Sequence, residues 1–75
     1  MRLSELSVGD HGVISDITGL PPEQRKRLVA LGLLPNTPVQ LIRRAPLGDP
    51  IQIRLRGGDL AIQKRIANCV EVCLK

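Results

Sequence analysis

The chain has 75 residues, of which 43% are hydrophobic and 24% charged, and its formal net charge is +4. This balance is typical of a small globular protein, and we expect residues 1–75 to form a single domain. The absence of Phe, Tyr and Trp excludes base-stacking surfaces, aromatic cages and aromatic grooves for proline-rich peptides, and we expect neither a membrane span nor a secretory signal.

Short apolar segments separated by glycine and proline predict a mainly β fold. Residues 3–6 are predicted to form a short turn, and residues 11–17 a first strand. Period-two alternation along this strand places Val13 and Ile17 on one face and Ile14 on the other.

One helix is predicted over residues 22–31. Pro22 suits its first turn, where the missing N–H of proline costs nothing. Leu28 and Leu31 have the spacing of an inward-facing stripe. Gly32 is placed to end the helix in the left-handed conformation.

The second half of the chain predicts further strands. Residues 39–44 form one of them, with a β-bulge near Arg43 and Arg44 that lets Val39 and Leu41 both point inward. Residues 51–55 alternate regularly between apolar and polar side chains, as expected of a strand with one buried face. The remaining predicted elements are a hairpin turn at 57–58, a strand at 60–63, a tight turn at 64–68 and a strand at 70–74.

Five short strands, one inserted helix and an aliphatic core predict a small, strongly bent β-barrel. Closing the sheet in this way would hide the strand edges, which otherwise invite pairing with other chains. The fold class expected from the pattern is therefore mainly β, a five-stranded barrel with one helix at about residues 22–31.

Residues capable of catalysis are few and scattered. His11 is the only histidine, and no two carboxylates have a spacing that suggests a paired acid and base. The sequence also lacks glycine-rich phosphate-binding motifs. We therefore expect no enzymatic activity.

The two cysteines, Cys69 and Cys73, leave a metal-binding alternative open. On a strand they lie about 13 Å apart, too far for a disulfide, and free thiols suit a reducing cytoplasm. A structural zinc site usually needs four ligands, so incidental thiols are the favoured interpretation. The alternative is a carrier or sensor in which His11, Cys69 and Cys73 transiently bind Fe²⁺ or Zn²⁺.

The segment 45–50 is the most unusual stretch of the chain. Two prolines restrict its backbone, a glycine permits a sharp turn, and an aspartate can accept hydrogen bonds from nearby N–H groups. Leu47 at its centre either plugs one end of the barrel or presents an apolar contact to a partner. The candidate partner-binding residues are this loop and two leucines that flank the helix, namely Leu20, Leu33, Pro46, Leu47, Gly48, Asp49 and Pro50.

The basic residues are spread along the chain, and a solvated surface is their favoured interpretation. Nucleic-acid binding through Arg44, Arg54 and Arg56 is a weaker alternative, because without aromatic stacking it would depend on phosphate contacts alone. We expect no nucleic-acid partner.

The combination of a leucine-glycine-leucine turn in residues 27–39 with the sequence A-P-L-G-D-P in residues 43–51 resembles the ferrous iron transport protein A (FeoA) family. The match extends to residues 3–6, 56–62 and 70–72. Asn36 stands where glycine is common in the family, and the cysteine pair is a further departure from its pattern.

This resemblance implies an SH3-like β-barrel with an inserted helix. It also implies a small bacterial cytoplasmic protein that acts as an adaptor or regulator of ferrous iron uptake. We expect no resident cofactor. The implied partner is FeoB, a membrane transporter with a cytoplasmic GTP-binding domain. Contact with FeoB would place the protein at the inner membrane without a membrane span of its own.

Overall fold

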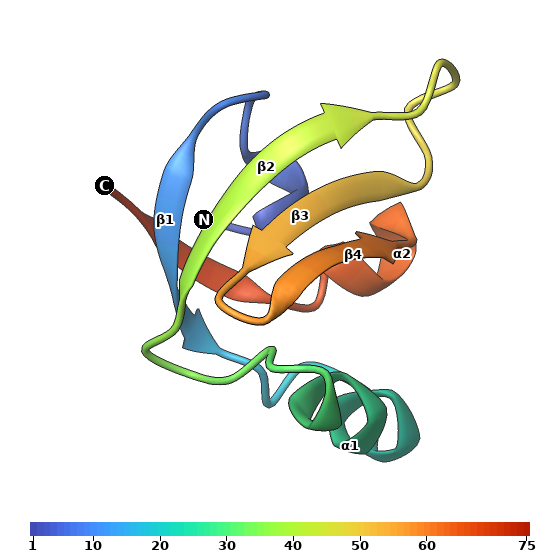
Figure 1. The fold of residues 1–75 in the computed structure, drawn as a ribbon. Helices are drawn as coiled ribbons and strands as arrows, with labels where there is room; N and C mark the ends of the chain where they lie inside the picture. The colour runs from blue at the N-terminus through green and yellow to red at the C-terminus, as the bar shows by residue number, and fades with distance from the viewer.

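The structure of residues 1–75 is a computed structural model built around one five-stranded antiparallel sheet. The strand order is β4-β3-β2-β1-β5, and the sheet curves around an aliphatic core (Figure 1). The elements in chain order are the 3-10 helix η1 (Leu3–Glu5), β1 (His11–Asp16), α1 (Pro22–Ala30), β2 (Pro38–Arg44), β3 (Ile51–Leu55), β4 (Gly58–Ile62), α2 (Lys64–Ala67) and β5 (Glu71–Leu74). The predicted mainly β architecture with an inserted helix is confirmed.

An irregularity in β1 decides which of its side chains are buried. The pairing of β1 with β5 shifts register between Ile14 and Asp16. Because the extra residue interrupts the alternation, Ile14 and Ile17 both enter the core while Val13 stays half-buried. The predicted division of these residues between two faces is therefore wrong.

A second register shift lies in β2, between Leu41 and Arg43. It confirms the predicted bulge, and Val39 and Leu41 are both buried. The regular alternation predicted for β3 is also confirmed, because its three apolar side chains all lie in the core, namely Ile51, Ile53 and Leu55.

The end of α1 differs from the prediction by a single residue, with a large effect on burial. The helix stops at Ala30, and Gly32 takes a φ of 100°, as predicted for a left-handed stop. The backbone N–H of Leu33 then donates to the carbonyl oxygen of Leu28 at 2.9 Å, and Leu33 enters the core. Leu31 was expected to face inward but is 49% exposed.

The sheet ends differently at its two edges. The outer side of β5 is covered by the start of the chain, where the N–H of Leu3 donates to the carbonyl oxygen of Val70 at 2.8 Å and the N–H of Val72 donates to that of Met1 at 2.7 Å. At the other edge, β4 pairs only with β3. The expectation that barrel closure hides every edge is therefore wrong for β4.

Helix α1 lies outside the barrel, below the β4 side of the sheet in Figure 1. Only Leu28 of this helix is fully buried. None of the helices has the length and apolar character needed to cross a membrane.

Candidate functional site

The loop between β2 and β3 carries the most exposed apolar side chain of the protein. Leu47 lies at the tip of this loop and is 96% exposed. The loop projects away from the barrel (Figure 1). Two backbone hydrogen bonds shape the loop. The N–H of Ala45 donates to the carbonyl oxygen of Pro50 at 3.0 Å, and the N–H of Gly48 donates to the carbonyl oxygen of Ala45 at 2.7 Å. Leu47 therefore does not plug the barrel but points outward, and its contact with a partner stays a prediction.

Asp49 connects this loop to the rest of the fold. Its Oδ1 atom accepts a hydrogen bond from the backbone N–H of Lys64, the first residue of α2, at 2.9 Å. This backbone donor has no partner within the helix, so the carboxylate satisfies it. The loop is thereby held at both ends by β-strands and near its tip by α2.

The two leucines that flank α1 lie elsewhere. Leu20 is 2% exposed and Leu33 is 0% exposed, and both pack in the core. Their side chains cannot touch a partner in this conformation. The structure therefore does not bring the predicted partner-binding residues together at the surface, because only those of the loop are accessible.

The candidate metal ligands are not brought together. His11 is exposed at the start of β1, Cys73 is exposed on β5, and Cys69 is half-buried after α2, where its thiol donates to the carbonyl oxygen of Arg65 at 3.6 Å. No three His, Cys, Asp or Glu side chains of the chain form a group that could hold a metal ion. The alternative of a carrier or sensor built on these three residues has no geometric basis.

Two of the arginines considered for nucleic-acid contacts serve the fold instead. Arg44 is half-buried, and its Nη2 atom donates to the carbonyl oxygens of Ser4 at 2.9 Å and Leu6 at 2.5 Å. Arg54 forms a forked pair with Asp59, with Nε to Oδ1 at 2.8 Å and Nη2 to Oδ2 at 3.2 Å. This hydrogen bonding holds the pKa of the Asp59 carboxyl below its ordinary value.

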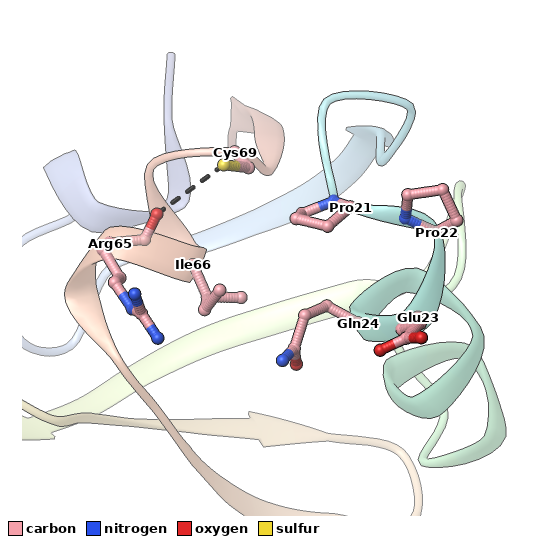
Figure 2. Close-up of a pocket in the computed structure, with 7 residues that line it drawn as sticks. All are labelled: Pro21, Pro22, Glu23, Gln24, Arg65, Ile66 and Cys69. Atoms are coloured by element: carbon pink, nitrogen blue, oxygen red, sulfur yellow. Dashed lines mark hydrogen bonds between the residues drawn. The ribbon is translucent and has the colours of Figure 1, made fainter.

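A groove that the sequence did not reveal runs along α1. Its larger part has a volume of about 690 Å³ and lies between the start of α1 and α2. Figure 2 shows Ile66 and Gln24 pointing into this space from opposite sides, with Pro21 and Cys69 at its upper end. Its walls come from two segments far apart in the chain, 21–24 and 65–69, so no local pattern could predict it.

The groove continues along the sheet. A second part of about 400 Å³ lies between α1, β4 and α2, and it shares Gln24, Arg65 and Ile66 with the first part. Leu31, which the sequence analysis placed in the core, lines it together with Leu60. We call the two parts together the α1 groove.

The strand order, the strong bend of the sheet and the helix inserted after β1 define an SH3-like β-barrel domain. The FeoA domain family model matches residues 1–73, and the chain belongs to this family. The resemblance seen in the sequence is thereby confirmed. The family is a non-enzymatic accessory domain associated with ferrous iron transport.

Three relatives show the range of the similarity. The chain is 33% identical over 72 residues to the Fe(2+) transport protein A/Fe(2+) transporter FeoB fusion protein of Porphyromonas gingivalis. The matched region covers 96% of this chain but only 8% of that relative. The solution structure of FeoA from Chlorobium tepidum is similar with a TM-score of 0.93 and 35% identity, over 99% of this chain and 70% of that chain. FeoA of Stenotrophomonas maltophilia, solved in complex with zinc and described as an SH3 domain protein, has a TM-score of 0.81 and 25% identity, over 96% and 88% of the two chains.

Proposed function

We propose that residues 1–75 act as a single-domain cytoplasmic accessory protein that binds a FeoB-type ferrous iron transporter and regulates it. The Porphyromonas gingivalis relative, named as a fusion of the two proteins, supports the choice of partner, because fusion keeps both parts together. The docking residues in this proposal are those of the loop tip, Pro46 to Pro50. The observation that carries the proposal is the exposure of Leu47, at 96%.

Burial of a leucine side chain at an interface contributes about 1.5–3 kcal/mol. The loop around Leu47 is already ordered by its backbone hydrogen bonds and by Asp49, so little conformational entropy is lost when it docks. A net charge of +4 adds attraction to an acidic partner surface and speeds the encounter.

The first test replaces Leu47 with Asp and measures binding to the soluble cytoplasmic domain of the transporter. Leu47→Asp should weaken binding by about tenfold or more, because a charged group replaces the apolar contact. Val8→Asp is the matched control, since Val8 is also exposed, at 60%, but lies in the turn before β1. Equal binding by the Leu47→Asp variant and the native protein would contradict the proposed docking site.

The second test measures ferrous iron uptake by bacteria that lack this protein. We expect slow uptake, restored by the native chain and by Val8→Asp but not by Leu47→Asp. Uptake at full speed without the protein would contradict the regulatory role itself.

A further inference from the structure

We propose that the α1 groove binds an extended acidic segment of a partner protein, which pairs with the free edge of β4. This inference is separate from the docking of Leu47, because it concerns different residues and a different mode of contact. It depends on the open edge of the sheet, on the path of the groove and on the charges that line it.

The open edge of β4 offers backbone groups for pairing. The β3–β4 hairpin closes on the pair Leu55 and Gly58, with two residues between them, so this is a hydrogen-bonded pair. Because hydrogen-bonded and non-bonded pairs alternate in an antiparallel ladder, Leu60 also bonds to β3. The N–H and C=O groups of Asp59 and Ala61 therefore point away from β3, where the sheet has no further strand.

The groove runs along this edge and not across one face of the sheet. Leu60, Ala61 and Ile62 all line it, although successive side chains of a strand point to opposite faces. Contact with three consecutive residues is expected where a groove follows the edge of a strand. The opposite wall is formed by Leu28 of α1 and by Leu31, which directly follows the helix. A segment lying here would have a strand on one side and a helix on the other.

The surface of the groove selects the chemistry of its occupant. Leu31 is 49% exposed, and Leu60 and Ile66 are half-buried, so apolar side chains of the segment can pack against them. Arg27 and Arg65 line the part beside β4, where there is no acidic side chain, whereas Glu23 lies in the other part, between the start of α1 and α2. Since an extended chain alternates its side chains, a segment with apolar residues on one side and acidic residues on the other satisfies both requirements.

The probe for this proposal is a short capped peptide of alternating leucine and glutamate, added to the full chain and followed by NMR. We expect amide shifts along β4 and α1 and a slower hydrogen exchange of the Ala61 N–H. The N–H of Leu60, already bonded to β3, is the internal control and should change little. Shifts without any slowing at Ala61 would show that the peptide does not extend the sheet and would overturn the proposal.

The charge requirement is tested with the same peptide carrying lysine in place of glutamate. It should bind about tenfold more weakly or not at all, and 0.5 M salt should weaken the acidic peptide. Arg27→Glu and Arg65→Glu should each weaken the acidic peptide, whereas the matched control Arg43→Glu, on the exposed outer face of β2, should not. Equal binding of both peptides would refute the electrostatic part of the argument.

The edge itself is tested with Ala61→Pro. Proline is tolerated at an edge position whose N–H faces solvent, so the β3–β4 ladder should persist while the outward donor is lost. We expect about tenfold weaker binding of the acidic peptide. Unchanged peptide binding by a folded Ala61→Pro protein would overturn the proposal. A stable dimer seen by light scattering and prevented by the same substitution would also overturn it, because the edge would then bind a second copy of this chain.

Discussion

The carboxylate of Asp49 and the backbone N–H of Lys64 meet at 2.9 Å, although 15 residues separate them in the chain. Through this hydrogen bond the loop that presents Leu47 is fastened to α2, which forms one wall of the α1 groove. The two surfaces proposed for partner contacts are therefore mechanically connected at this point.

Asp49→Ala removes this connection. We expect a loss of about 0.5–1 kcal/mol in the free energy of unfolding, because one exposed hydrogen bond to a helix start is lost. Faster amide exchange in residues 45–50 and at Lys64 should accompany it. Asp49→Asn retains an oxygen acceptor and serves as the control; an equal loss in both variants would contradict the role of the hydrogen bond.

Arg44 should matter more for stability than its neighbour Arg43. Arg44→Met leaves the carbonyl oxygens of Ser4 and Leu6 without their charged donor, and we expect a cost of about 2–3 kcal/mol in chemical denaturation. Arg43→Met removes an exposed side chain of the same size and should change stability by less than about 0.5 kcal/mol. Similar values for both variants would show that Arg44 does not anchor the first turn of the chain.

Gly12→Ala tests the close approach of β1 and β5. A Cβ atom at Gly12 would lie 2.9 Å from the backbone oxygen of Cys73, so the strands must move apart, at a cost of about 1–3 kcal/mol. Gly57→Ala is the control, because nothing lies within 4 Å of its added Cβ atom. We expect a lower Tm for Gly12→Ala and a nearly unchanged Tm for Gly57→Ala.

The pair formed by Arg54 and Asp59 should make stability depend on pH in the acid range. The hydrogen bond from Arg54 lowers the pKa of Asp59 in the folded protein, with a smaller contribution from Gln52. A carboxyl whose folded pKa is depressed contributes stability that is present above about pH 4 and is lost as the pH falls through the folded value. The difference in unfolding free energy between the native protein and Asp59→Asn should therefore shrink on acidification below pH 4. A constant difference down to strongly acidic pH would contradict this.

Local patterns predicted much of the fold because they depend on neighbouring residues. The alternation of Ile51, Ile53 and Leu55 indicated β3, and Pro22 and Gly32 marked the two ends of α1 to within a residue. Asn36 takes a φ of 66°, a left-handed conformation that asparagine adopts more readily than most residues. The loop 45–50 was also recognised from its own residues as a stiffened turn with an apolar centre.

The positions of side chains relative to distant segments could not be predicted in the same way. Leu20 and Leu33 have the same character as Leu47, yet two are buried and one is 96% exposed. Leu31 has helical spacing from Leu28, but the chain turns away before it reaches the core. These outcomes depend on how each segment packs against distant segments, and a short stretch of neighbouring residues holds no information about that packing.

The amino-acid sequence by itself determined the family, the mainly β pattern and the unusual loop, because backbone propensities and motif residues act over a few positions. The tertiary structure alone decided that β5 is covered while β4 stays open, that α1 stands off the barrel to form a groove, and that Asp49 holds α2. Each of these depends on how segments remote in the chain are placed relative to one another. Strand register and the covering of sheet edges depend on how the whole chain packs. A register shift of one residue reverses which backbone N–H and C=O groups are left unpaired at an edge.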